Sequence, residues 1–565
     1  MYSPPVPEML FTLRHVIGLT QISALPGQDG LPELMDPILG EAAKLAEGVL
    51  APLNTAGDKG GAVWKDGSVT TAKGWKEAYN AYRDGGWNAV PFSPDHGGQG
   101  LPWVMAFPVQ EMWQAANMAF GLCPLLNQGA VEAIAHHGAK DLQDYYLPKL
   151  VSGEWTGTMN LTEPQAGSDL AAVRTKAERT GDGTYKIFGS KIFITYGEHD
   201  LADNIIHLVL ARLPDGPAGV KGISLFIVPK FLKEGTRNDL TCASIEHKLG
   251  IHGSPTCTMS FGDKGGAVGY LVGAEHEGIK YMFTMMNNAR LSVGLQGVAI
   301  ADRATQKAIQ YAKDRVQGGA KPIIEHADVK RMILTMQACT SAGRMMAYDA
   351  AYHADAGNQG RVELMTPVVK GWCTDRSVDV ASLGVQIHGG MGFIEETGAA
   401  QYYRDARILP IYEGTNGIQA LDLVGRKIMK DNGAALSAWL NEQNDLLNEL
   451  QDAKGDDFEI IRDSLENGLQ CVRDTMPALT PENAGAVAHP FLTLLGNAMA
   501  MRYLAKAASE AQKCLVSADF STLSADQLDH QILLARFFAE HILPAVDGLA
   551  RTVKSGAAVV NAARL

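Results

Sequence analysis

The spacing of apolar residues changes twice along the chain. From about Met35 to Trp155, apolar residues recur every three or four positions, which predicts amphipathic helices. Near Thr156 the pattern becomes short runs rich in β-branched and aromatic residues, separated by Gly, Asp and Pro, and these predict strands as far as about Val272. The helical spacing returns from Gly273. The pattern therefore predicts a β-domain between two helical regions, in an α+β multidomain chain.

The same pattern predicts individual elements. A short apolar stripe predicts a helix over residues 8–19, and Gly and Pro predict a loop over Phe92–Trp103. Three long helices are expected after the β-domain, over residues 281–315, 325–354 and 362–387. We expect an N-terminal extension, a helical domain, an antiparallel β-domain, a second helical domain and an additional helical domain, with the bounds 1–35, 36–155, 156–272, 273–430 and 431–565.

Composition excludes several classes of protein. The 565 residues carry a formal net charge of −13, which argues against a nucleic-acid surface. The seven cysteines are scattered without a CxxC pair, so they predict free thiols, a reducing compartment such as the cytoplasm, and no metal site. The first residues lack the basic and apolar regions of a secretory signal. We expect no membrane-spanning helix, because no stretch approaches about 18 consecutive apolar residues.

Two motifs flank the start of the predicted β-domain. In LTEPQAGSD, residues 161–169, Gly167 and Ser168 can expose consecutive backbone N–H groups to an anion or a ring carbonyl. In KIFITYG, residues 191–197, Phe193 and Thr195 share a face of a regular strand and can hold a flat heterocycle. Each motif also fits an ordinary surface turn or a half-buried strand.

Two further motifs follow the third long helix. QIHGGMGF, residues 386–393, has three glycines in four positions, which suits either the end of a helix or close approach of a phosphate. In RILPIYEGTNG, residues 407–417, Glu413 follows an apolar run. A carboxylate held against apolar surface has a raised pKa and is a better base. A solvated loop glutamate is the alternative.

Together, these motifs resemble the signatures of the acyl-CoA dehydrogenase superfamily, in their order and approximate spacing over residues 36–430. The segment RLSVGLQGVAIADRATQKAIQYAKDR, residues 290–315, adds to the resemblance. The opening segment and the long C-terminal region are similar to the large subgroup that includes 3-methylmercaptopropionyl-CoA dehydrogenase. The resemblance implies a helical domain, an antiparallel β-barrel and a second helical domain that sandwich FAD, followed by extra helices.

The resemblance also implies roles for particular residues. Glu413 is expected to be the catalytic base, and Ser168, Arg290 and Tyr412 are expected to lie at the substrate. Arg315 and the 386–390 turn are expected to complete the FAD site of a neighbouring subunit. The full set of expected FAD-binding residues is Leu161, Thr162, Gly167, Ser168, Phe193, Thr195, Arg315, Gln386, Gly389, Gly390, Thr415 and Gly417.

The implied reaction is FAD-dependent α,β-dehydrogenation of an acyl-CoA thioester to the trans-2-enoyl-CoA. In the family, the base removes the α-proton and flavin N5 accepts the β-hydride. The substrate is expected to be 3-methylmercaptopropionyl-CoA, as in dimethylsulfoniopropionate catabolism, or a short- or medium-chain acyl-CoA of fatty acid metabolism. An electron-transfer flavoprotein is the expected acceptor, and the enzyme is expected to be a homo-oligomer, either a dimer or a tetramer.

Two positions depart from common family patterns. Many members have Trp where this chain has Phe193, so the resemblance leaves open how an electron acceptor docks beside the flavin. Some members place the base on the long helix just before its Arg, but this chain has Ala289 there, which cannot accept a proton. Glu413 therefore has no obvious rival as the base.

Two alternative functions stay open. An acyl-CoA oxidase would pass electrons directly to oxygen. A non-catalytic, nucleic-acid-associated flavoprotein would need a basic C-terminal region. Residues 431–565 instead carry 18 acidic and 10 basic side chains, a net charge of −8, which argues against the second alternative.

Overall fold

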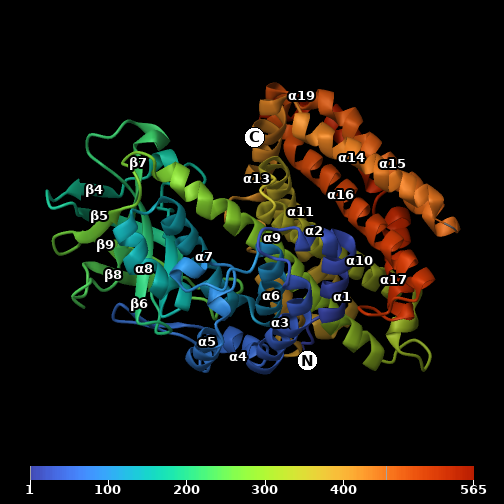
Figure 1. Ribbon diagram of the computed structural model, residues 1–565, viewed down its shortest axis with the longest axis horizontal. Helices are drawn as coiled ribbons and strands as arrows, with labels where there is room; N and C mark the ends of the chain where they lie inside the picture. Colours follow the sequence, from blue (N-terminus) through green and yellow to red (C-terminus); the bar gives the residue numbers. More distant parts are fainter. Residues whose placement is uncertain (1, 454, 565) are drawn as a thin grey trace. The chain divides into compact units, whose positions relative to one another are not determined.

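The computed structural model describes residues 2–453 and 455–564. The chain forms two compact units, each built from separate stretches of sequence. The first unit comprises Met1–Lys44, Pro102–Ala115 and Arg290–Leu565, and the second comprises Leu45–Leu101 and Ala116–Ala289. Helix α9, Gly278–Asp314, begins in the second unit and continues into the first (Figure 1).

The second unit contains the strands. Those of the large sheet are β3 (Trp155–Asn160), β4 (Lys176–Arg179), β5 (Tyr185–Thr195), β6 (Asn204–Arg212), β7 (Ile223–Pro229), β8 (Leu240–Ile245), β9 (Thr256–Phe261) and β10 (Ala267–Leu271). A separate hairpin consists of β1 (Val63–Lys65) and β2 (Ser68–Thr70). The helical elements are η2 (Ala46–Leu50), α4 (Leu53–Gly60), α5 (Trp75–Asp84), η3 (Trp87–Ala89), η4 (Pro94–His96), α7 (Met118–His137), α8 (Lys140–Ser152), η5 (Leu170–Ala172) and η6 (Gly219–Gly222).

The eight-stranded sheet closes on itself, as expected for a barrel. Its order is β10-β7-β6-β4-β5-β9-β8, and an additional pairing of β10 with β5 closes the ring. Most neighbours are antiparallel, in agreement with the sequence prediction. β3 and β4 differ, because each pairs with β6 in parallel. Strands β6 and β7 are buried along almost their whole length, which explains their unbroken apolar sequences.

Helix α7 packs directly on the sheet. Gly157 of β3 makes the close approach possible, because a Cβ at this position would lie 2.2 Å from the Cβ of Ala130. Ala130 belongs to a core that also includes Met282 and Met285 from the first turns of α9. The second unit therefore has one core shared by α7, the sheet and the start of α9.

Helix α7 also corrects one sequence prediction. Within the described residues, it is the one helix long and apolar enough to cross a membrane, with a mean hydropathy of 1.2 in its most apolar 18-residue window. We expected no such helix. In the structure, 89% of this window is buried inside the protein, so α7 serves as a core helix.

The described residues of the first unit form helices joined by turns and loops, with one isolated β-bridge between Val316 and Pro322. Its α-helices, apart from α9, are α1 (Val6–Phe11), α2 (Leu19–Ser23), α3 (Leu31–Leu45), α6 (Trp103–Ala116), α10 (Ala327–Asp355), α11 (Gln359–His388), α12 (Ala399–Ala406), α13 (Asn416–Asp422), α14 (Ala434–Asp452), α15 (Asp456–Thr475), α16 (Pro481–Ser517), α17 (Ala525–His541), α18 (Ala545–Lys554) and α19 (Ala558–Asn561). The short 3-10 and π-helical segments are η1 (Thr12–Gly18), η7 (Ile323–Glu325), η8 (Gly389–Phe393), η9 (Glu395–Thr397), η10 (Leu423–Ile428), η11 (Met429–Asp431) and η12 (Met476–Ala478).

Helix α16 connects the C-terminal helices to the rest of this unit. It packs against α15, α17 and α18, and also against α10 and α11 (Figure 1). Gly496 of α16 lies against Trp372 of α11, whose ring would clash with any Cβ at 2.3 Å. The Trp372 indole N–H donates to Asn497 Oδ1 at 2.9 Å. The close packing and the buried hydrogen bond fix the position of α16 on α11.

A buried ionic network joins α6, α9 and α10 in the first unit. Arg344 Nη2 donates to Glu111 Oε1 at 2.6 Å and to Asp302 Oδ1 at 3.3 Å. Tyr348 donates its hydroxyl hydrogen to Glu111 Oε2 at 2.6 Å. The Glu111 side chain is fully buried and that of Arg344 is 5% exposed. Burial raises the pKa of Asp302 to about 6.

Candidate active site

The LTEPQAGSD loop is tied to strand β5 by a buried ion pair. Lys191 Nζ donates to Glu163 Oε1 at 2.8 Å and to the Leu161 carbonyl at 3.0 Å. Glu163 also accepts backbone N–H bonds from Arg174 and Thr175, at 2.7 and 3.0 Å. The Lys191 ammonium and these hydrogen bonds hold the pKa of Glu163 near 2, against the opposing effect of burial. The LTEPQAGSD loop and the KIFITYG strand are therefore held together by this ion pair and its hydrogen bonds.

The end of this loop is open to solvent. Gly167 and Ser168 are exposed, and a Cβ at Gly167 would meet no atom within 4 Å. Leu161 and Thr162 are half-buried, and the Thr162 carbonyl accepts the Ile192 backbone N–H at 2.9 Å. The loop is anchored at Glu163 and presents its Gly-Ser end outward.

Strand β5 is not regular where it carries Phe193. The register with β9 shifts between Lys191 and Ile194, and Phe193 has φ +60, a left-handed conformation rare for a bulky residue. Our assumption of a regular strand at this point is therefore wrong. The bulge leaves the Phe193 side chain 57% exposed, while Ile194 is buried and Thr195 is half-buried. An exposed aromatic ring in a strained backbone position is a candidate platform for a ligand.

Glu413 occupies a tight left-handed turn in the first unit. Its φ is +54 and that of Gly414 is +88, and the turn leads into α13, whose first turn is capped by the Thr415 hydroxyl. The Glu413 side chain is half-buried. Burial raises the pKa of Glu413, and the positive charges of Arg290 and Lys370 oppose the rise. This environment suits a carboxylate that accepts and releases a proton.

Lys370 of α11 forms hydrogen bonds with the Glu413 turn. Lys370 is fully buried, and its Nζ donates to the Gly414 carbonyl and to Asn416 Oδ1, both at 2.8 Å. Asn416 in turn donates to Asp375 Oδ1 at 2.7 Å and to the Gly371 carbonyl at 3.0 Å. Burial lowers the pKa of Lys370 to about 7. The turn is thus fixed by hydrogen bonds at Gly414 and at Asn416.

Arg290 and Tyr412 lie in the same unit as this turn, and both have buried polar partners. Arg290 Nη1 is 3.4 Å from Asp422 Oδ2, and the buried Arg290 Nε has no hydrogen-bond partner within the described residues. The half-buried Tyr412 donates its hydroxyl hydrogen to Gln296 Oε1. The Gln296 amide also donates to Gln114 Oε1 at 3.0 Å. Arg290 therefore keeps an unused donor close to the charge of Glu413.

The glycine turn after α11 forms a second exposed feature of the first unit. Helix α11 ends at His388, and Gly389 has φ +60 at its C-cap. Gln386, Gly389 and Gly390 are exposed, and a Cβ at either glycine would meet no atom within 4 Å. Arg315, just after α9, is also exposed. An amide, a guanidinium and uncovered glycine backbone are donors that suit phosphate.

The structure groups the predicted residues by unit. Leu161, Thr162, Gly167, Ser168, Phe193 and Thr195 belong to the second unit; Arg290, Arg315, Gln386, Gly389, Gly390, Tyr412, Glu413, Thr415 and Gly417 belong to the first. Sequence reasoning missed Glu163, Lys191, Lys370 and Asn416. Glu163 and Lys191 stand inside the quoted motifs, whereas Lys370 lies in the third long helix; a Lys in an otherwise apolar segment was the available signal for Lys191 and Lys370.

Comparison with known families gives a consistent result along most of the chain. Profiles described as acyl-CoA dehydrogenase N-terminal, middle and C-terminal domains match residues 41–154, 158–264 and 276–429. A fourth profile, "Acetyl-CoA dehydrogenase C-terminal like", matches residues 429–564.

Individual proteins are similar over most of their length. A 3-methylmercaptopropionyl-CoA dehydrogenase from Ruegeria pomeroyi is 45% identical, over 96% of each chain. A butyryl-CoA dehydrogenase from Syntrophomonas wolfei is 34% identical, over 92% of this chain and 91% of the other. The crystal structure of an acyl-CoA dehydrogenase from Bacillus anthracis, complexed with FAD, has the same fold, with a TM-score of 0.76 and 21% identity over 96% of this chain and 91% of that one.

Proposed function

We propose that Glu413 is the catalytic base of this chain, which belongs to the acyl-CoA dehydrogenase family. The enzyme class is that of an oxidoreductase, and FAD is the cofactor of the family. The observation that carries the proposal is the Glu413 turn. It holds a half-buried carboxylate of raised pKa beside two buried cations. We propose that this carboxylate removes the α-proton of an acyl-CoA thioester, which becomes the trans-2-enoyl-CoA.

The exposed groups of each unit fit FAD. In the second unit, the Phe193 ring, the Gly167–Ser168 backbone and the Thr162 hydroxyl offer apolar contact and hydrogen-bond donors to a flat heterocycle. In the first unit, the donors at Arg315 and Gln386–Gly390 suit a pyrophosphate. We propose these residues, with Leu161, Thr195, Thr415 and Gly417, as the FAD contacts. When bound, FAD supplies the acceptor for the β-hydride of the substrate.

The residues around Glu413 explain how it can act. The α-proton of a thioester is weakly acidic, so the base needs a fixed position and a dry environment. Lys370 fixes the turn through the Gly414 carbonyl, and its positive charge opposes the rise in the pKa of Glu413 that burial causes. Arg290 adds a second positive charge from α9. We propose that Ser168, Arg290 and Tyr412 contact the acyl-CoA.

The pH dependence of the first half-reaction follows from the raised pKa of Glu413. The base works only when it is ionised, so the rate falls as pH falls through this pKa. We expect the acid limb of the rate of flavin bleaching by acyl-CoA to lie above 4.5, the ordinary pKa of a glutamic acid. Stopped-flow measurements over a range of pH would determine it. An acid limb at or below 4.5 would contradict a buried base.

We propose that the substrate is a short- or medium-chain acyl-CoA, with 3-methylmercaptopropionyl-CoA as the first candidate. The support is the 45% identity to a relative of that name over nearly the whole chain. A panel of thioether, straight-chain and branched acyl-CoAs, assayed with an artificial one-electron acceptor, tests the proposal. We expect the highest kcat/KM with the thioether or with a chain of similar length. A clear preference for long or branched chains would contradict it.

The electron acceptor can be decided in the same assay. We propose an electron-transfer flavoprotein, as is usual in the family, rather than oxygen. Slow turnover in air without an added acceptor would agree with this proposal. Stoichiometric hydrogen peroxide at comparable rates would favour an acyl-CoA oxidase.

We also propose that the enzyme is a homo-oligomer. The glycine turn is followed by exposed apolar side chains, with Met391 48% and Phe393 85% exposed, and such a patch favours contact with another chain. This supports the expectation that Gln386–Gly390 and Arg315 complete the FAD site of a neighbouring subunit.

The seven cysteines are all free thiols, which supports a reducing compartment, and we propose the cytoplasm.

A further inference from the structure

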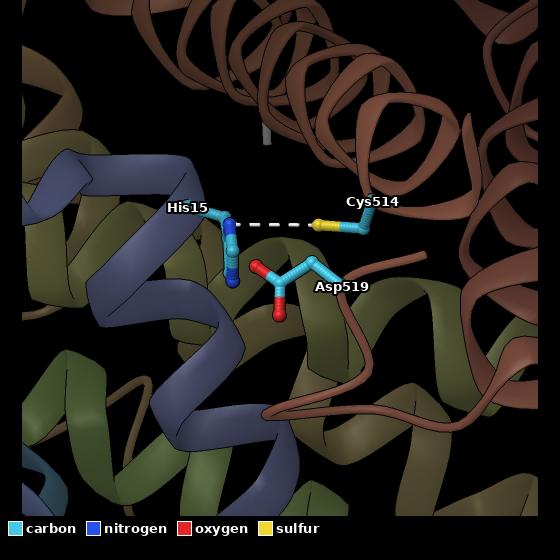
Figure 2. A group of neighbouring side chains, drawn as sticks. All are labelled: His15, Cys514 and Asp519. Atoms are coloured by element: carbon cyan, nitrogen blue, oxygen red, sulfur yellow. Dashed lines mark hydrogen bonds between the residues drawn. The ribbon is translucent and has the colours of Figure 1, made fainter. Parts of the chain in front are cut away.

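Three side chains from distant parts of the sequence converge within the first unit. His15 lies in η1, Cys514 near the end of α16, and Asp519 in the segment after α16 (Figure 2). One nitrogen, the sulfur and one carboxylate oxygen all lie within 4.8 Å of one another. Within the described residues, this is the one group of at least three His, Cys, Asp or Glu side chains arranged so closely.

The backbone brings two of these residues together before any ligand is considered. Helix α16 ends with Ala518 in the left-handed conformation, at φ +55. This reverses the chain, so the Asp519 backbone N–H donates to the Cys514 carbonyl at 2.9 Å. Asp519 Oδ1 also accepts the Ser521 backbone N–H at 3.1 Å. The thiol and the carboxylate are therefore held side by side by the helix terminus.

The third residue approaches from the N-terminal segment. The His15 ring lies next to the Phe11 ring, with their centroids 5.2 Å apart. His15 Nδ1 is 3.6 Å from Cys514 Sγ, the interaction drawn as a dashed line in Figure 2. His15 Nε2 is buried and has no hydrogen-bond partner within the described residues. A neutral imidazole that offers its Nδ1 lone pair toward Cys514 carries its ring proton on Nε2, the tautomer that a metal bound at Nδ1 requires.

The distance between sulfur and nitrogen fits a shared metal ion. In a tetrahedral zinc site, Zn–S is about 2.3 Å and Zn–N about 2.0–2.1 Å, so the two ligand atoms lie roughly 3.6 Å apart. The observed separation is 3.6 Å. Thiolate, imidazole and carboxylate are also the three ligand types that Zn²⁺ prefers.

The charges around the group favour a cation. The nearby Arg14 forms an ion pair with Asp36. Lys513 is bound by Glu449 at 2.5 Å and by Glu510 at 2.9 Å. Both neighbouring cations are thus balanced by carboxylates of their own. The negative charges of Asp519 and Glu510 act on both Cys514 and His15.

We propose that His15, Cys514 and Asp519 bind one Zn²⁺ ion, with the fourth position open to water. Binding forms a Zn–S bond and releases the Cys514 thiol proton to solvent, without any redox change. The ion would link η1 to the end of α16 through His15 and Cys514, which are 499 residues apart in sequence. That separation explains why cysteine spacing alone predicted no metal site.

Metal analysis of the FAD-loaded enzyme tests the proposal directly. We expect about one zinc per chain after dialysis against Zn²⁺, and a thiolate-to-cobalt charge-transfer band when Co²⁺ replaces it. Cys514→Ser should remove that band. Cys471→Ser is the matched control, because Cys471 Sγ lies 3.5 Å from Asp547 Oδ1 without a histidine in the pair. The control variant should keep both the zinc and the band.

A second variant, Asp519→Asn, tests the same site if Cys514→Ser does not fold. Asp519 is exposed, and Asp519→Asn keeps an oxygen for the Ser521 N–H. It should weaken Co²⁺ binding at least about tenfold, the loss that changing a residue behind a metal ligand typically causes. The proposal is overturned if the wild-type enzyme binds no Zn²⁺ and shows no cobalt band. It is equally overturned if binding survives unchanged in Cys514→Ser or Asp519→Asn.

Discussion

The Glu413→Gln enzyme is expected to bind FAD and acyl-CoA normally but to leave the flavin almost unbleached when substrate is added. Glutamine keeps the size and the backbone N–H of residue 413, and it removes only the proton acceptor. General-base catalysis typically contributes about 10²–10⁴-fold to a rate, and a base acting on so weak an acid in a half-buried site is expected at or above the upper end. Stopped-flow absorbance, together with the flavin content of the purified variant, provides the measurement.

Two further variants separate the chemistry of residue 413 from general damage. Glu413→Asp should retain a little activity, because its carboxylate is withdrawn by about one methylene group. Glu466→Gln makes the same chemical change on an exposed residue of α15 and should leave the rate unchanged. If Glu413→Gln is bleached at close to the wild-type rate, the base lies elsewhere, although the family assignment is unaffected.

The largest loss of stability is expected from Glu111→Leu. This change leaves the Arg344 guanidinium buried with Asp302 as its remaining carboxylate partner, and it removes the acceptor of the Tyr348 hydroxyl. Breaking one side of a buried ion pair typically costs about 3–5 kcal/mol. We expect a lower urea midpoint for the loss of helical circular dichroism, measured on the FAD-loaded enzyme.

The matched control for this prediction is the double variant Glu111→Leu/Arg344→Leu. It also removes the guanidinium that lost Glu111, and Asp302 still accepts a hydrogen bond from Gln306 Nε2 at 2.7 Å. Replacing a buried pair in this way is often close to neutral. The double variant should therefore be more stable than Glu111→Leu alone. Equal instability of the two would show that cavity or packing effects, rather than the loss of one carboxylate partner of Arg344, dominate at this position.

The sequence predicted most of the fold because the spacing of apolar residues reports the local secondary structure, helix or strand, of each segment. The change of spacing near Thr156 marks β3 at Trp155–Asn160, and the three long helices correspond to α9, α10 and α11. The family and the fold class are confirmed by the comparisons. The parallel pairing of β3 with β6 was missed, because strand partners are set by tertiary packing rather than by local spacing.

The candidate site was predicted less completely, for a related reason. Motif residues such as Glu413 and Phe193 were identified because they stand inside recognisable segments. The bulge that exposes Phe193 depends on how β5 pairs with β9, which no local pattern encodes. Likewise, Lys370 lies 44 residues before Gly414, and only the packing of α11 against the turn brings them together. The domain bounds and the individual ligand contacts remain predictions.

Helix α7 is synthesised before some of the residues that cover its apolar surface in the folded protein. Its apolar surface is covered in part by Met282 and Met285, which the ribosome adds long after the helix itself. At typical synthesis rates, α7 waits roughly 10–30 s for those residues to emerge. During that interval, a nascent chain displays a helix that the cell can mistake for a membrane span.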